Sequence, residues 1–131
     1  MQFKDIIYEV KSDYAHVTIN RPKVLNAFPP ITLQELKTAL DSAEKDKNVG
    51  VIILSGAGGK AFCAGGDMNW ESSKEFQDHE YEFHIHITKC SKPIIAKVGG
   101  YAIGGGNAHS LPWCALILVQ RVKDKAMWVV H

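Results

Sequence analysis

Two glycine-rich segments hold the residues of this sequence whose types and spacing are best suited to chemistry. They read Ala64-Gly65-Gly66-Asp67 and Gly104-Gly105-Gly106-Asn107. Glycine allows a ligand to approach the backbone closely, and the first N–H groups of a helix have no intrahelical partner and carry a partial positive charge. If each segment opens a helix, one N–H from each could point at the same oxygen. That arrangement is an oxyanion hole, which stabilises negative charge on a carbonyl or thioester oxygen.

Two other interpretations of the glycine-rich turns stay open at this point. Both segments could be tight turns at which helices pack close to strands. Residues 56–61 also fit G-x-G-x-x-[GA] after an apolar stretch, the pattern of a nicotinamide dinucleotide-binding module. Two features disfavour that module. Residues 63–66 do not have the sequence of a helix start, and no strand ending in an acidic residue follows about 20 residues later. A P-loop is excluded because Gly59-Lys60 is followed by Ala61.

Four segments are predicted to be the strands that position these turns. β-Branched and aromatic residues in near alternation predict strands at Ile6–Val10 and His16–Asn20, joined by a turn at residues 11–13. The apolar runs Val49–Leu54 and Ile94–Val98 are typical of buried strands, the first of them in a parallel sheet.

Two helices complete the predicted elements. Apolar residues at helical spacing predict a helix from Thr32 to Lys45, with Thr32 as N-cap and Glu35 completing a capping box. The polar, mildly periodic residues 67–90 predict a second helix. Strand, glycine-rich turn and helix start recur at 49–67 and 94–108. This alternation predicts one α/β domain in which helices cover a sheet.

Composition excludes several classes of function. The 131 residues include 15 Lys and Arg and 14 Asp and Glu, a formal net charge of +1, which gives no reason to expect binding to nucleic acid or an anionic membrane. The longest apolar run, Leu111–Val119, contains a proline and is shorter than the roughly 20 residues that cross a bilayer. The cysteines Cys63, Cys90 and Cys114 form no CxxC pair, so we expect reduced thiols and a cytoplasmic location.

Three motifs, in the right order and at roughly the right spacing, resemble the crotonase (enoyl-CoA hydratase/isomerase) superfamily. They are Asn20-Arg21-Pro22 followed by Asn26-Ala27, then Lys60 to Asp67 (KAFCAGGD), then Gly100 to Gly106 (GYAIGGG). The resemblance covers about residues 1–110, a partial acyl-CoA-binding domain, and leaves residues 111–131 as a divergent tail.

The resemblance implies a crotonase-like spiral of repeated ββα units that binds acyl-CoA and polarises its thioester carbonyl. The thioester is the substrate, no further cofactor or metal is expected, and family members form trimers or dimers of trimers. By position, the oxyanion hole would use the backbone N–H groups of Gly66 and Gly105. The coenzyme A path would be lined by Val24, Ala27, Ala64, Asp67 and Met68.

One departure from the family pattern bears on the chemistry. Hydratases of the family carry a general acid/base glutamate two residues after the last glycine of the triplet, where this chain has Ala108. Without that carboxylate, water addition has no proton carrier. Met1–Glu9 and Gly100–Asn107 are instead similar to the branch of naphthoate synthase and 2-ketocyclohexanecarboxyl-CoA hydrolase. That branch forms or breaks carbon–carbon bonds through a thioester enolate, so lyase or hydrolase chemistry is expected.

The tail departs furthest from the family pattern. The family continues with an apolar helix, a Cys-Asp strand start and a C-terminal helical region, whereas here Cys114 is followed by Ala115 and residues 109–131 match poorly. A truncated, frameshifted or degenerate reading frame explains the mismatch. The alternative hypothesis is therefore a non-catalytic family fragment that at most binds coenzyme A thioesters. With the C-terminal helical region missing, the tail could return to the sheet as a strand.

Five side chains have competing functional and structural interpretations. His79, Glu82 and His86 share a helix face at i, i+3 and i+7 and could hold zinc, but no fourth ligand is evident and a solvated face is favoured. Cys63 could be taken for a nucleophile, but it has no assigned base and apolar packing is favoured. Asp67 is favoured as a carboxylate at a helix N-terminus rather than as a catalytic group.

Overall fold

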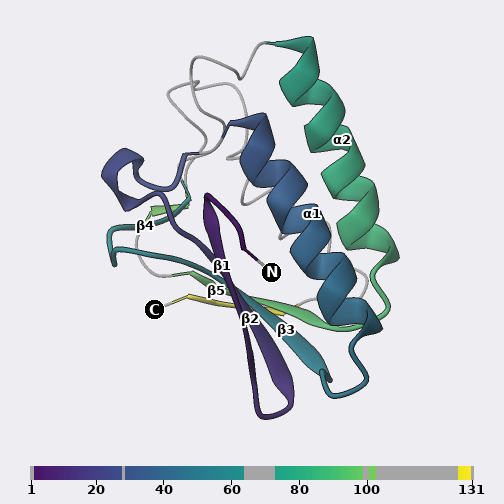
Figure 1. The fold of residues 1–131 in the computed structure, drawn as a ribbon. Helices are drawn as coiled ribbons and strands as arrows, with labels where there is room; N and C mark the ends of the chain where they lie inside the picture. The colour runs from purple at the N-terminus through teal and green to yellow at the C-terminus, as the bar shows by residue number, and fades with distance from the viewer. Residues whose placement is uncertain (1, 28, 64–72, 99–100, 103–126, 131) are drawn as a thin grey trace.

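The computed structural model has two layers, with both helices packed against one face of a sheet (Figure 1). It describes residues 2–27, 29–63, 73–98, 101–102 and 127–130. In chain order the elements are β1 (Ile6–Lys11), β2 (Tyr14–Ile19), the 3₁₀ turn η1 (Pro22–Val24), α1 (Pro30–Lys45), β3 (Val51–Gly56), β4 (Ala61–Cys63), α2 (Lys74–Lys89), β5 (Ile94–Val98), β6 (Tyr101–Ala102) and β7 (Met127–Val130). The predicted α/β fold is confirmed, with β1-β2-α1 and β3-β4-α2 as two ββα units.

The main sheet is mixed and has the strand order β1-β2-β3-β5-β7. β1 and β2 are antiparallel, whereas the other neighbours in the sheet are parallel. Parallel neighbours need a crossover connection, which α1 supplies between β2 and β3 and α2 between β3 and β5. β7 lies within residues 111–131, the predicted tail, and this part of the chain does return to the sheet as a strand.

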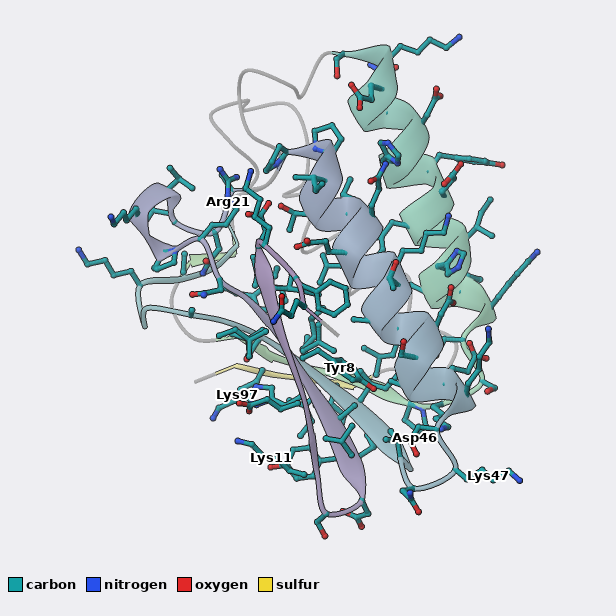
Figure 2. All side chains as sticks on the ribbon, in the orientation of Figure 1. Tyr8, Lys11, Arg21, Asp46, Lys47 and Lys97 are labelled. Carbon is teal, nitrogen blue, oxygen red and sulfur yellow. The ribbon has the colours of Figure 1, made fainter. Side chains whose placement is uncertain are left out.

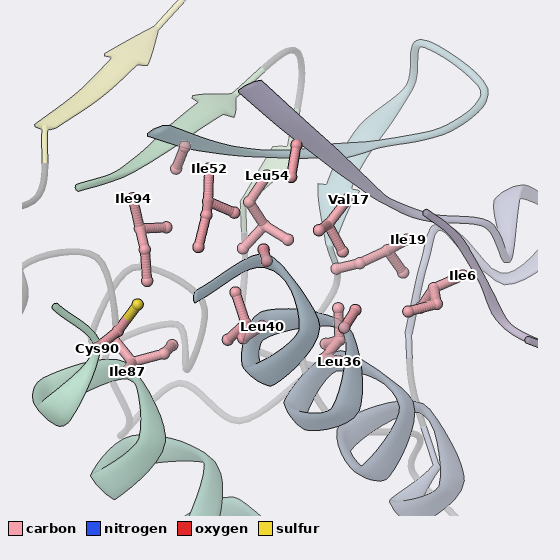
Figure 3. Packing of buried hydrophobic residues seen from close by; sticks show 14 of the residues in the cluster. Ile6, Val17, Ile19, Leu36, Leu40, Ile52, Leu54, Ile87, Cys90 and Ile94 are labelled. Atoms are coloured by element: carbon pink, nitrogen blue, oxygen red, sulfur yellow. The ribbon is translucent and has the colours of Figure 1, made fainter. Parts of the chain in front are cut away.

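The core lies between the sheet and the helices (Figure 3). Alternation along β2 and β3 turns every second side chain toward the helices, and these are Ala15, Val17, Ile19, Ile52 and Leu54. Side chains three and four residues apart meet them from the helices, among them Leu33, Leu36, Leu40, Phe83 and Ile87. Each large side chain buried in this way contributes about 1.5–3 kcal/mol, so the helix–sheet contact stabilises the fold.

The capping box predicted for α1 is wrong. The helix begins at Pro30, after Pro29, and its start has no side-chain cap. Thr32 is buried in the first turn, and its hydroxyl donates to the carboxylate of Asp5 at 2.7 Å. The Glu35 carboxylate accepts the backbone N–H groups of Lys4 and Asp5, each at 2.7 Å. The local pattern is present, but partners from the N-terminal segment use both side chains.

β3 begins two residues later than its apolar run predicts. The N–H of Val49 donates to the carbonyl of Asp46 at 3.1 Å, which closes the turn after α1. The N–H of Gly50 donates to Asp13, in the β1–β2 turn, at 2.7 Å. Pairing with β2 therefore starts only at Val51.

α2 spans Lys74–Lys89, inside the stretch 67–90 that the sequence predicts as helix. Residues 64–72 lie outside the described residues. After the helix, Cys90 is buried in the core and forms no disulfide. In the part of the chain that the structure describes, no helix is long and apolar enough to cross a membrane.

The turn at Gly58-Gly59 leads into a strand, β4, and not into a helix. A dinucleotide-binding turn needs a helix directly after its glycines, so that the pyrophosphate can lie at the helix N-terminus. The nicotinamide interpretation of residues 56–61 is therefore wrong. Both glycines have positive φ, 92° and 74°, which a tight turn between two strands requires.

Gly56 lies at the end of β3, where no side chain fits. A Cβ there would lie 2.3 Å from the carbonyl oxygen of Phe62 and 2.6 Å from that of Ala61. We expect Gly56→Ala to lower the free energy of unfolding by about 1–3 kcal/mol, because the backbone must shift. Gly50→Ala is the matched control, since its Cβ would approach only the Asp13 carbonyl, at 3.6 Å. Urea unfolding measures both variants, and equal stability would contradict the close approach of β3 and β4.

Candidate functional site

The two predicted glycine segments follow two short strands that lie side by side. β4 and β6 pair in parallel, with Ala61 opposite Tyr101 and Cys63 opposite Ala102. Parallel strands end at the same edge of a sheet, so the chain leaves both strands at one edge. The roles of the following residues stay predictions, because Ala64, Gly66, Asp67, Met68 and Gly105 lie outside the described residues.

The loop between β2 and α1 holds Val24 and Ala27, the other two residues predicted for the coenzyme A path. Val24 ends η1 and is 44% exposed, whereas Ala27 is half-buried. The N–H of Ala27 donates to the carbonyl of Val24 at 3.0 Å. The two residues therefore lie on one turn with a fixed spacing. The loop that holds them lies beside β4, because Asn26 between them donates to the carbonyl of Ala61 (Figure 1).

Asn26 joins this loop to the turn between β3 and β4. Its side chain is fully buried, and its Nδ2 donates to the carbonyls of Ala57 at 2.9 Å and Ala61 at 2.8 Å. Its Oδ1 accepts the N–H of Arg21 at 2.8 Å. These bonds satisfy both ends of the amide, as a buried polar group requires. The loop is thus bonded to the turn that leads into β4.

Two consecutive residues of the loop have a left-handed backbone. φ is 55° at Leu25 and 59° at Asn26. Asparagine tolerates this region, whereas a bulky residue there costs about 1–3 kcal/mol. The Leu25 side chain is 40% exposed, so its burial offsets little of that cost. The sequence motif contains Asn26 without assigning it a role; the available signal is the preference of asparagine for such turns.

A buried carboxylate connects the N-terminal segment to the same loop. Asp5 is 6% exposed, and its Oδ1 lies 4.0 Å from Nε of Arg21. Arg21 also donates through Nη1 to the carbonyl of Ala27. The other carboxylate oxygen of Asp5 accepts the Thr32 hydroxyl, so α1, the N-terminal segment and the loop share one polar network. A buried charge requires such partners.

The side chains considered as zinc ligands on α2 each contact α1. The contacts are His79 with Gln34 at 3.0 Å, Glu82 with Lys37 at 3.0 Å and His86 with Asp41 at 3.2 Å. The partners are 45 residues apart in every case, so the two helices run in the same direction. The hydrogen bond from Lys37 lowers the pKa of the Glu82 carboxyl. Among the described residues, no group of three or more His, Cys, Asp and Glu could hold a metal ion.

His16 and Ser55 form a hydrogen-bonded pair on the sheet face away from the helices. Nε2 of His16 lies 2.7 Å from Oγ of Ser55, which joins β2 to β3. Partial burial lowers the pKa of His16; the charges of Lys11 and Lys97 also lower it, while Glu9 raises it. Figure 2 shows both lysines on this side of the sheet. His16 is therefore neutral near pH 7.

The sequence profile of one protein family covers most of the chain. That of the enoyl-CoA hydratase/isomerase family matches residues 9–121. The chain belongs to this family. The family resemblance that rests on the three motifs is confirmed, whereas the branch within the family stays a prediction.

Solved structures of the family share the fold of this chain. An enoyl-CoA hydratase/isomerase (crotonase) from Legionella pneumophila is 31% identical, with a TM-score of 0.78, over 97% of this chain and 48% of that one. An enoyl-CoA hydratase/isomerase from Xanthobacter autotrophicus is 25% identical, with a TM-score of 0.79, over 97% and 46%. A carnitinyl-CoA dehydratase from Mycobacterium thermoresistibile is 28% identical, with a TM-score of 0.70, over 79% and 33%. The chain thus spans about half the length of the first two structures.

The lowered pKa of His16 leads to a prediction about pH. The His16 ring takes up a proton more readily in the unfolded chain than in the folded protein, because its folded pKa is lowered. The contribution of the neutral ring to the free energy of unfolding is therefore fully present above pH 6.5, the ordinary pKa, and is lost as the pH falls through the folded pKa. We expect NMR titration of the His16 ring protons to give a midpoint below 6.5. His16→Gln should lose less stability than the wild type between about pH 7.5 and pH 5. A midpoint above 6.5, or the same pH dependence in both proteins, would contradict this environment.

Proposed function

We propose that this chain binds the thioester of an acyl-CoA and stabilises its enolate with the backbone N–H groups of Gly66 and Gly105. The observation that carries the proposal is the parallel pairing of β4 with β6, with Cys63 opposite Ala102. Each glycine lies three residues after its member of that pair in the sequence. The register shifts by one residue between Ala61–Tyr101 and this pair, so the spacing is equal when counted from the pair that ends the two strands. That common end supports two donors directed at one oxygen.

The chemistry of an enolate suits such a pair of donors. When the α carbon of a thioester loses a proton or a carbon substituent, negative charge develops on the carbonyl oxygen. Backbone donors held in place need no reorganisation to stabilise that charge, and one of them is worth about 3 kcal/mol. The proposed coenzyme A path is lined by Val24, Ala27, Ala64, Asp67 and Met68. The hydrogen bond from the loop to Ala61 supports one continuous path, because it makes the loop and β4 neighbours.

Lyase or hydrolase chemistry at a carbon–carbon bond is the proposed reaction class. Its support is Ala108, two residues after the glycine triplet, where a hydratase of the family needs a carboxylate. A carbon–carbon cleavage or closure through the enolate does not depend on a proton carrier at that position. The same residue also favours a second candidate, a chain that binds acyl-CoA without turnover. Turnover of an acyl-CoA by the purified chain distinguishes the two.

Ligand affinity tests the oxyanion hole. We expect acetoacetyl-CoA, whose enolate oxygen needs both donors, to bind more tightly than coenzyme A when both are measured by calorimetry. Gly105→Pro removes one N–H and should cost roughly 3 kcal/mol of that preference. Gly105→Ala is the matched control, because it keeps the N–H and should retain most of the preference. Equal affinity of the folded wild type for both ligands would rule out the oxyanion hole.

Hydration of crotonyl-CoA tests the reaction class. General acid/base catalysis contributes about 10²–10⁴-fold, and position 108 supplies no carboxylate. We therefore expect no hydration above background when the loss of crotonyl-CoA absorbance is followed with purified protein. Robust hydration would show that another residue supplies the acid/base group and would refute the lyase or hydrolase proposal.

A further inference from the structure

We propose that Asn26 is a positioning residue of the acyl-CoA site. It sets the loop that carries Val24 and Ala27 against the chain that leaves β4. The inference rests on the proposed function, because it concerns how two parts of that site lie relative to each other. The Asn26 side chain is fully buried and forms hydrogen bonds with backbone groups of Arg21, Ala57 and Ala61, so it acts through the segments it joins.

The amide of Asn26 bridges both ends of the β3–β4 turn. Its Nδ2 donates to Ala57, directly after β3, and to Ala61, the first residue of β4. Room for this group comes from Gly56, because a Cβ there would lie 2.8 Å from Nδ2. The direction in which the chain enters β4 therefore depends on one side chain of the β2–α1 loop.

The loop and the turn also touch at a second point. A Cβ at Gly58 would lie 2.7 Å from Cβ of Pro22, the first residue of η1. The N–H of Ala57 donates to the carbonyl of Ile19, the last residue of β2, at 2.8 Å. The two segments therefore approach closely at several points, and the Asn26 amide adds two side-chain hydrogen bonds between them.

Asparagine combines the three properties that this position uses. Its NH₂ group donates to two carbonyls, its carbonyl accepts the N–H of Arg21, and its backbone tolerates a φ of 59°. Aspartate has the same shape but lacks the donors, and its charge would face two carbonyl oxygens. Asn26→Asp is therefore the most selective change available at this position.

The affinities for acetoacetyl-CoA and coenzyme A, measured on the same variant, distinguish a positioning role of Asn26 from a purely structural one. We expect Asn26→Asp to weaken acetoacetyl-CoA binding about 10- to 100-fold more than coenzyme A binding, because only the acyl ligand must reach the loop and the oxyanion donors together. Asn48→Asp, the same change at an exposed turn residue, should alter neither affinity. A purely structural role would weaken both ligands equally, in proportion to the unfolded fraction, and that result would overturn the proposal.

Native-state hydrogen exchange of the wild type tests the same link without a variant. The N–H of Asn26 bonds to Arg21 in the loop, and the N–H of Ala57 bonds to Ile19 at the turn. If the amide side chain holds loop and turn together, both protons should exchange with the same opening free energy and the same urea dependence. Separate openings would overturn the proposal even if Asn26→Asp failed to fold. If the wild type bound neither ligand, the proposed function would be wrong, and the exchange result would still decide the link.

Discussion

A single buried amide, the side chain of Asn26, is the contact on which the geometry of this site depends. It closes the loop after β2, bridges the two ends of the β3–β4 turn and joins the two segments. Without it, the carbonyls of Ala57 and Ala61 would lose a buried donor, and each unsatisfied group costs about 1–3 kcal/mol. Arg21 and Asp5 extend the network to the first turn of α1. Segments far apart in the sequence are thereby held together by side-chain contacts rather than by a shared helix or strand.

Repetition of the ββα unit supplies the other constraint. β3 and β5 are parallel neighbours in the main sheet, with Ile52 opposite Ile94. The strands that follow them, β4 and β6, are therefore brought together in parallel as well. Two ββα units side by side thus bring together β4 and β6, the strands that precede the two glycine segments in the sequence. The proposed paired-donor site depends on this stacking of the units.

Patterns along the chain predict the elements but not the contacts between them. Alternation and apolar runs locate β1, β2, β3 and β5 to within about two residues, because those patterns follow directly from burial of one face or both faces. The capping box at Thr32 and Glu35 fails because two groups of the N-terminal segment compete for the same side chains. β4 and β6 are missed because strands of three and two residues carry too little pattern.

The sequence motifs identify the family and the expected site, while the role of Asn26 needs the structure. A motif shows that an asparagine is present, but only the fold shows that carbonyls about 30 residues away meet its amide. The same holds for His79, Glu82 and His86, whose spacing fits a metal site, although each faces a partner on α1.

The central claim is that the N–H groups of Gly66 and Gly105 bind one oxygen, and NMR of a protein labelled with ¹⁵N-glycine tests it most directly. The chain has 11 glycines, so every amide can be resolved and assigned. On addition of acetoacetyl-CoA, we expect large downfield proton shifts for Gly66 and Gly105 together, as charge-assisted hydrogen bonds form. Gly50, which precedes β3 and so lies at the opposite end of that strand from β4, should not move. Saturable binding with shifts at only one of the two glycines, or at neither, would contradict the account.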